Sequence, residues 1–305
     1  MKKFLFFIVS VSNIVLFAEE LITPIPTQID VDKRKVALGK ELFFDPQLSK
    51  DGTISCAMCH QLENGGDDNM RVSIGIDGQE GSINAPTVLN ATFNYYQFWN
   101  GRAKTLKEQA MGPVENPVEM GHDFKVLVHS LEKTSYKKKF NAIYGNGITK
   151  ENIADAIAEY EKTLITPNSP FDLYLKGNQD VLTQDQKEGY ELFKTKGCIA
   201  CHHCVNIGGN LYNKFGIYTD SRSKDLGRYN VTHNERDRYY FKVPTLRNIE
   251  KTAPYFHDGR TTDLAEAVRI MAMYQLGRKI TDEEVKKIVA FLKSLNGQLL
   301  EEIEY

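Results

Sequence analysis

The sequence predicts a mainly α-helical protein made of two domains that are related by internal duplication. Apolar residues recur at helical spacing in segments 151–165 and 281–295, whereas the strict alternation typical of strands is hard to find. Several short motifs in residues 38–109 return in the same order in residues 189–267. Because there are only two copies, the repetition indicates two related domains and not a solenoid.

Two segments have the clearest helical pattern. TDEEVKKIVAFLKSL (281–295) begins with Thr281 and Glu284 in the positions of a capping box. ENIADAIAEYEKTLI (151–165) has a comparable apolar face. The apolar stripes comprise Ile153, Ile157, Tyr160 and Leu164 in the earlier segment and Val285, Ile288, Val289, Leu292 and Leu295 in the later one. Both segments are therefore predicted to be helices that pack on a core.

The boundary between the two domains is expected near residue 166. The prolines of TPNSPF (166–171) indicate a linker, and Thr183 with Gln186 marks the start of another helix soon after it. The N-terminal domain is therefore predicted to span residues 19–166 and the C-terminal domain residues 167–305. Each is long enough to bury its own core.

Two CxxCH motifs, CAMCH (56–60) and CIACH (198–202), carry most of the chemistry. Two thiols three residues apart on one helical turn add to the two vinyl groups of a haem, and the next histidine binds its iron. The predicted attachment residues are Cys56, Cys59, Cys198 and Cys201, with His60 and His202 as iron ligands. A zinc site would bring both pairs into one small unit, and a redox dithiol would need a βαβ pattern. The sequence therefore predicts two cytochrome c-like domains, each with one covalently bound c-type haem.

The same order of motifs surrounds both CxxCH segments. E-L-F precedes each one, a PT-L-x-N segment and an aromatic G-R segment follow, and a helix comes last. The corresponding pairs are LGKELFFDPQLSKDGTISCAMCH (38–60) and GYELFKTKGCIACH (189–202), NAPTVLN (84–90) and KVPTLRN (242–248), and QFWNGRAKTLKEQ (97–109) and YFHDGRTTDLAEA (255–267).

The first residues, MKKFLFFIVSVSNIVLFAEE, have the layout of a secretory signal peptide over residues 1–18, with two lysines, an interrupted apolar run and Ala18. An N-terminal anchor that stays attached is the alternative. Either way the chain is expected to leave the cytoplasm, and c-type haem is attached outside the bacterial cytoplasm, so we expect a periplasmic protein. The net charge of −2 provides no basic field for nucleic acid.

The two haem sites are not equivalent. A haem that only carries electrons is best six-coordinate, whereas one that reacts with a small molecule needs an open face. When the G-R motifs are aligned, the second domain offers Met271 and Met273 as sixth ligands, although one or both could be core residues. The first domain has Pro113 at the place of Met271, and proline cannot bind iron.

The segment EQAMGPVENPVEMGH (108–122) is the candidate for the reactive side of the first haem. Gly112, Pro113 and Pro117 are expected to break the helix into a loop there. A carboxylate held beside a haem can move the proton that heterolytic cleavage of a peroxide requires. The segment offers Gln109, Met111, Glu115, Glu119, Met120 and His122. The only tryptophan, Trp99, takes the place of His257 and could assist electron passage between the haems or simply belong to the core.

Taken together, these motifs resemble those of the bacterial di-haem cytochrome c peroxidases, and the likeness runs from LGKELFFDPQLS to QLGRKITDEE. The resemblance implies a high-potential C-terminal haem held by His202 and Met271. That haem would take electrons from a small periplasmic donor such as a monohaem cytochrome c or a cupredoxin. The N-terminal haem on His60 would be the low-potential peroxidatic site.

The resemblance also implies roles for other residues. The catalytic glutamate falls on Glu119, its accompanying glutamine on Gln109, and the tryptophan between the haems on Trp99. The family's Ca²⁺ between the domains would be bound through Asn84, Thr252 and Pro254. A homodimer is implied as well.

One position departs from the family pattern. In SIGIDGQEG (73–81), Ile76 stands where many members have a histidine that caps the oxidised peroxidatic haem. Because isoleucine cannot bind iron, we expect this haem to be open at rest or capped by His122 or Met111.

The leading functional prediction is an enzyme that reduces hydrogen peroxide to water. A related di-haem enzyme acting on another substrate and a non-enzymatic di-haem electron carrier are the alternatives. His203 and Cys204, which follow the second CxxCH, receive no role, and Cys204 is expected to be a free thiol or a cross-link between chains.

Overall fold

The computed structural model describes residues 21–300, so the predicted signal peptide of residues 1–18 lies outside the described residues. The structure is mainly helical, as predicted. The α-helices are α1 (Lys33–Phe44), α2 (Cys56–Cys59), α3 (Leu106–Glu115), α4 (Phe124–Leu131), α5 (Tyr136–Ile143), α6 (Lys150–Lys162), α7 (Pro170–Leu175), α8 (Gln184–Thr195), α9 (Tyr229–Thr232), α10 (Leu264–Leu276) and α11 (Asp282–Lys293). Two short strands, β1 (Tyr212–Lys214) and β2 (Tyr240–Lys242), pair antiparallel with Tyr212 opposite Lys242.

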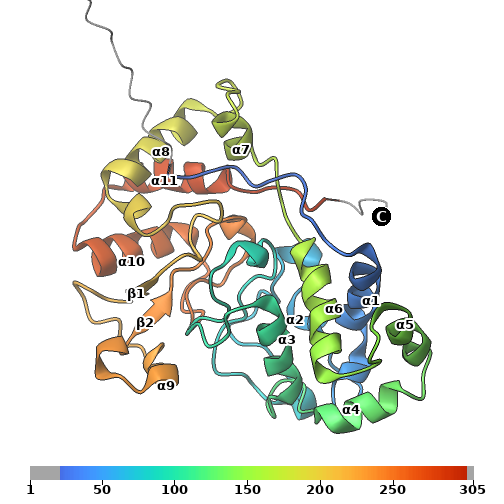
Figure 1. Ribbon diagram of the computed structural model, residues 1–305. Helices are drawn as coiled ribbons and strands as arrows, with labels where there is room; N and C mark the ends of the chain where they lie inside the picture. Colours follow the sequence, from blue (N-terminus) through green and yellow to red (C-terminus); the bar gives the residue numbers. More distant parts are fainter. Residues whose placement is uncertain (1–20, 301–305) are drawn as a thin grey trace, which may run out of the picture.

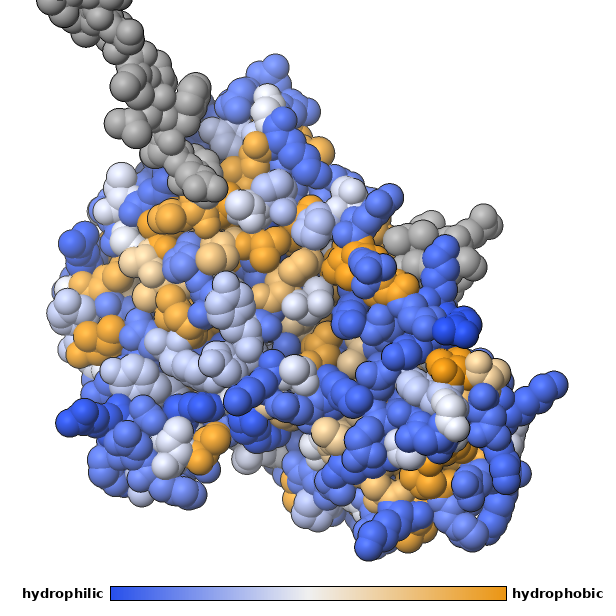
Figure 2. Space-filling view, in the orientation of Figure 1, coloured by the Kyte–Doolittle hydropathy of each residue, from blue (hydrophilic) through white to orange (hydrophobic). Residues whose placement is uncertain are grey.

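The helices form two modules. Figure 1 shows α1 to α6 gathered on one side of the molecule and α7, α8, α10 and α11 on the other. Each group surrounds its own apolar core, one built around α1 and α6 and the other around α8 and α11. In the view of Figure 2, apolar residues at the surface gather mainly over the second module. No helix within residues 21–300 is long and apolar enough to cross a membrane.

The same helix crossing supports both modules. A Cβ at Gly39 of α1 would lie 1.8 Å from the carbonyl oxygen of Ala156 in α6, and a Cβ at Gly189 of α8 would lie 1.9 Å from that of Lys287 in α11. Gly39 and Gly189 each stand two residues before E-L-F. The absent side chain lets the two helices approach closely at equivalent points, which confirms the internal duplication in three dimensions.

The predicted helix starts are present. Capping boxes open α8 at Thr183 and Gln186 and α11 at Thr281 and Glu284, while the Thr149 side chain caps α6. The predicted faces are largely correct, except that Val289 is only half-buried and Phe291 is buried in its place.

The expectation that Pro113 ends its helix was wrong. Helix α3 continues through Gly112 and Pro113 to Glu115, and the loop begins only at Asn116. The amide of Asn116 donates to the Gly112 carbonyl at 3.0 Å and closes the last turn. Proline is tolerated because it removes a single N–H group near the C-terminal end of the helix.

The junction between the modules is buried, whereas a linker would ordinarily be exposed. The hydroxyl of Thr166 accepts from the Asn90 amide at 2.8 Å and from the Asn248 amide at 2.9 Å. Asn90 and Asn248 end the two copies of the PT-L-x-N motif. The repeated asparagines of both modules therefore donate to the same hydroxyl group, that of Thr166, and this shared contact links the two modules.

The ends of the described chain cross between the modules. Ile22 belongs to the core of the second module, and the amide of Ile25 donates to Asp172 in α7. Leu299, near the other end, packs against the core of the first module. Residues 21–25 therefore pack on the second module, although their place in the sequence puts them in the first predicted domain.

Candidate functional site

Each CxxCH motif folds into a single tight turn. Cys56 and Cys59 are the ends of α2, and Cys198 begins a short 3₁₀ helix, Cys198–Ala200. The backbone amide of His60 donates to the Cys56 carbonyl at 2.9 Å, and that of His202 donates to the Cys198 carbonyl at 3.0 Å. The two thiols and the following imidazole are thus held within one turn, as covalent haem attachment requires.

Both histidines have the same orienting contact. Nδ1 of His60 lies 3.2 Å from the carbonyl oxygen of Gly66, and Nδ1 of His202 lies 3.3 Å from that of Ile207. A carbonyl accepts the proton of Nδ1, which leaves the lone pair on Nε2 for a metal. Burial lowers the pKa of His60 and lowers that of His202 to about 4, so both imidazoles are neutral. A neutral imidazole is the form that binds iron.

The repeated E-L-F motif contributes to both sites. Its phenylalanine, Phe43 or Phe193, lies beside the histidine of its own module, with ring centroids 6.5 Å apart for Phe43 and His60 and 6.4 Å apart for Phe193 and His202. The motif therefore places one ring against each histidine.

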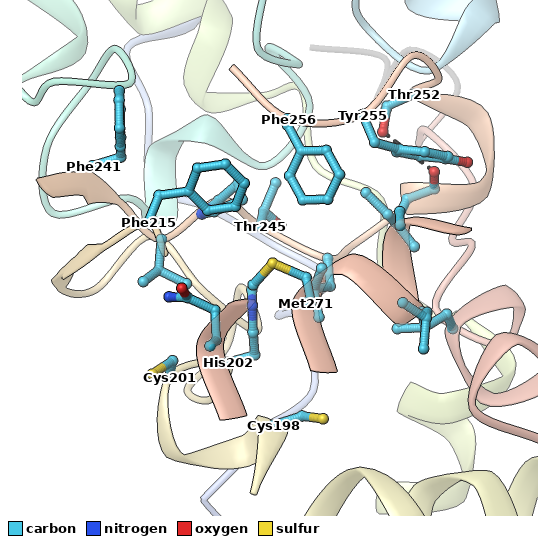
Figure 3. Close-up of a pocket in the computed structure, with 18 of the residues that line it drawn as sticks. Cys198, Cys201, His202, Phe215, Phe241, Thr245, Thr252, Tyr255, Phe256 and Met271 are labelled. Atoms are coloured by element: carbon cyan, nitrogen blue, oxygen red, sulfur yellow. Dashed lines mark hydrogen bonds between the residues drawn. The ribbon is translucent and has the colours of Figure 1, made fainter. Parts of the chain in front are cut away.

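The second site opens into a mainly apolar cavity of about 220 Å³. Cys198, Cys201 and His202 line it from one side and Met271 of α10 from the other, and Figure 3 shows the side chains of His202 and Met271 pointing toward one another. Met273 is not among the lining residues. The structure therefore favours Met271 over Met273 as the residue able to face a haem on His202, and its bond to iron remains a prediction.

Trp99 lies on the wall of this cavity, where the two modules meet. Its indole N–H donates to the Asn84 carbonyl at 2.9 Å, and its ring makes an edge contact with His257 at a centroid distance of 6.1 Å. Trp99 and His257 occupy equivalent positions in the two modules. Equivalent residues of the two modules therefore contact each other at the module boundary, in an edge-to-face arrangement.

The residues assigned to calcium contribute to the lining of this cavity. Asn84, Thr252 and Pro254 all line the cavity, as does the buried Asp67. The amide nitrogen of Asn84 donates to the Met70 carbonyl at 2.9 Å, which leaves its side-chain oxygen available. Burial, and to a lesser degree the charge of Asp68, raises the pKa of Asp67 to about 7. Hard oxygen donors of this kind are suited to Ca²⁺.

Glu119 lies in the loop that follows α3. Its Oε1 accepts from the Asn116 amide at 2.7 Å. Burial raises the pKa of this carboxyl group, while the positive charge of Arg102 and the Asn116 hydrogen bond act in the opposite direction. Gln109 is half-buried on α3, and within the described residues no hydrogen bond joins its side chain to Glu119. The structure thus places both residues at the first module without linking them directly.

Ile76 packs against the Glu119 loop. Its amide donates to the Glu119 carbonyl at 2.9 Å, its side chain is 5% exposed, and a Cβ at Gly121 would lie 2.4 Å from its Cδ1. Met120 is buried in the first core and Met111 packs against that core, whereas His122 is half-buried. The place of the family's capping histidine is therefore filled by a packed aliphatic side chain.

The sequence analysis missed two residues near Glu119, namely Asn116 and Arg102. In the second module Arg260 pairs with Asp258 at 2.5 Å, whereas Arg102 has Asn100 at the position of that aspartate. Arg102 stacks on the Phe98 ring at 3.3 Å, and its charge acts on Glu119. Comparing NGR with DGR in the two copies could have revealed that Arg102 lacks the aspartate partner of Arg260. No comparable signal marks Asn116.

Two c-type haem sites on one duplicated helical scaffold define a di-haem cytochrome protein. The residues fit this cofactor because each module offers two thiols and a neutral, oriented imidazole. The family model described as di-haem cytochrome c peroxidase matches residues 33–180, and that of cytochrome c matches residues 186–296.

Named relatives support the match. The chain is 49% identical to the cytochrome c551 peroxidase of Nitrosomonas europaea, covering 93% of this chain and 86% of the relative. It is 50% identical to the cytochrome c peroxidase of Escherichia coli over 91% of this chain, but spans only 61% of that relative's length. Among solved structures, a MauG-like protein associated with microbial copper homeostasis has a TM-score of 0.79 at 25% identity, covering 91% of this chain and 93% of the other.

The chain therefore belongs to the di-haem cytochrome c peroxidase family. The predicted fold class, the two haem c groups and the prediction of a peroxidase-class oxidoreductase are confirmed at the level of that family.

Proposed function

We propose that this protein reduces hydrogen peroxide to water in the periplasm, with electrons from a small donor such as a monohaem cytochrome c or a cupredoxin. The observation that carries the proposal is the difference between two equivalent sites. Met271 faces His202 across the second site, whereas Pro113 stands at that position in the first module, with the Glu119 loop after it. One site is suited to electron entry and the other to chemistry.

Glu119 is the proton carrier in this proposal. When bound, the haems supply electrons and a binding position for peroxide; the overall reaction consumes two electrons and two protons for each peroxide. Because Asn116 holds Oε1, the other carboxylate oxygen of Glu119 is available to accept a proton and to return it. Gln109 orients the bound peroxide, and Trp99 lies on the electron path between the sites.

Three further features belong to the proposal. Ca²⁺ binds at Asn84, Thr252 and Pro254, and the support for this is that all three line the same cavity. Two copies of the chain form a homodimer. The peroxidatic haem is open at rest, supported by the burial of Ile76 where a capping histidine would otherwise be.

The test is steady-state peroxide reduction with reduced monohaem cytochrome c, run with and without prior reduction of the enzyme. We expect activity in both cases. Absence of activity in both would refute the peroxidase proposal, whereas activity only after prior reduction would leave it standing and refute the open resting site.

A further inference from the structure

Lys242 is a buried lysine that has no anionic partner among residues 21–300. It ends β2, it is 5% exposed, and within the described residues no hydrogen bond or ion pair involves its ammonium group. Burial alone lowers its pKa to about 8. A buried cation is costly unless it is paired, so this position requires an explanation.

Among residues 21–300, the other deeply buried cation, Arg247, has partners within the chain. The Arg247 guanidinium pairs with Asp172 at 2.7 Å and also donates to Val205 and Thr23 carbonyls. It therefore has a structural role that the chain itself completes. Lys242 differs because nothing among the described residues neutralises it.

The position of Lys242 indicates what can neutralise it. Lys242 lines the same cavity as Cys198, Cys201, His202 and Met271. The only carboxylate among the residues lining this cavity is Asp67, and the pKa of Asp67 is raised by burial and by Asp68, with no contribution from Lys242. The lining of the cavity therefore includes a lysine whose charge no carboxylate among the described residues compensates.

We propose that Lys242 pairs with a propionate carboxylate of the haem held by His202. Each haem carries two propionates, and an ammonium group supplies both the charge and the hydrogen-bond donors that a carboxylate needs. The inference rests on the haem assignment of the second module, and it does not depend on peroxide being the substrate.

The same residue also contacts the module boundary. The backbone amide of Lys242 donates to the Trp99 carbonyl at 2.8 Å. Lys242 is thus a positioning residue that touches the cofactor through its side chain and Trp99 through its backbone. Its charge near the iron disfavours the oxidised, more positive state, and so raises the reduction potential of the second haem.

The test compares Lys242→Met, Lys242→Gln and Lys242→Arg in the full protein loaded with haem. The reduction potential of each haem is measured by spectroelectrochemistry, and the propionate bending modes by resonance Raman. We expect the two neutral variants to lower the potential of the Met271-ligated haem and to shift its propionate mode. Lys242→Arg should restore both values, and the potential of the other haem should stay unchanged.

Lys196→Met is the matched control, since Lys196 lines the same cavity but is already paired with Glu284 at 2.5 Å. An unchanged potential in both Lys242→Met and Lys242→Gln, or an equal shift in the control, would overturn the inference. If Lys242→Met does not load haem, the comparison of Lys242→Gln with Lys242→Arg still decides. Peroxide turnover of the same variants separates this result from a failure of the proposed function.

Discussion

At the scale of single residues, the two modules are distinguished by substitutions at equivalent positions. Pro113 corresponds to Met271, Trp99 to His257, and Asn100 to Asp258. In the first module the aspartate that pairs with Arg260 is replaced by Asn100, and the charge of Arg102 acts instead on the half-buried Glu119. Small changes on a common backbone thus give the two modules different surroundings, with Met271 facing His202 in the second module and the Glu119 loop following Pro113 in the first.

Substituting Glu119→Gln should lower kcat by about 10²- to 10⁴-fold, because it removes the group that carries the proton. Both haem spectra should stay unchanged. Glu115→Gln is the matched control, since Glu115 is exposed and pairs with Lys150 at 2.8 Å. Retained turnover in Glu119→Gln would remove this residue from the mechanism.

The pH dependence of kcat/KM should reflect the raised pKa of Glu119. A raised pKa keeps the carboxyl group protonated to a higher pH, so kcat/KM falls as the pH drops through that pKa. Arg102→Gln removes the positive charge that lowers this pKa. The acid limb of the pH profile, where kcat/KM falls as the pH drops, should therefore move to higher pH. Arg102→Lys keeps the charge and should move it little. Identical acid limbs in the Gln variant and the wild type would contradict the coupling.

At the scale of elements, each module contains one close helix crossing, between α1 and α6 in the first module and between α8 and α11 in the second. The crossing is made possible by Gly39 in the first module and Gly189 in the second. Helices α3 and α10 also begin at equivalent positions, but α3 ends at Glu115 and the chain then turns into the Glu119 loop. The two helices thus start at equivalent positions and end differently, α10 continuing to Leu276 where α3 gives way to the Glu119 loop.

Gly39→Ala and Gly189→Ala should each destabilise the protein by about 1–3 kcal/mol or more, because the added methyl group meets a backbone carbonyl of the partner helix. Chemical unfolding of the haem-loaded protein measures the effect. Gly145→Ala is the control, since a Cβ there has no heavy atom within 4 Å. Equal stability of all three variants would show that the helices can move apart freely.

At the scale of the whole molecule, the modules are joined by contacts that bring equivalent residues together. Asn90 and Asn248 meet at Thr166, Trp99 meets His257, and the two ends of the described chain pack on opposite modules. Such a junction favours a fixed separation between the two haem sites, which electron passage between them requires.

An electron paramagnetic resonance spectrum of the fully oxidised protein should show one high-spin and one low-spin haem. The low-spin signal belongs to the site with Met271, and the high-spin signal to the site where Ile76 is buried in place of a capping histidine. Two low-spin haems would instead indicate a cap from another residue, with His122 and Met111 as the candidates.

The sequence by itself determined the haem chemistry, the duplication and the main helices. These depend on local patterns: the spacing of CxxCH on one turn, the capping residues, and the 3.6-residue repeat of apolar side chains. The inequality of the sites was also visible, because proline has no ligand to offer at the position of Met271.

Only the tertiary structure decided which groups share an environment. Four features depend on residues that are far apart in the sequence. They are the contacts of Asn90 and Asn248 with Thr166, the packing of each chain end on the opposite module, the burial of Ile76 beside Gly121, and the position of Lys242 on the cavity without an anionic partner among the described residues. Burial and charge compensation depend on the whole packed molecule, so a pattern of neighbouring letters does not contain them. Even the course of α3 through Pro113 depended on this wider packing, because one missing hydrogen bond is a small cost within a helix that packs on a core.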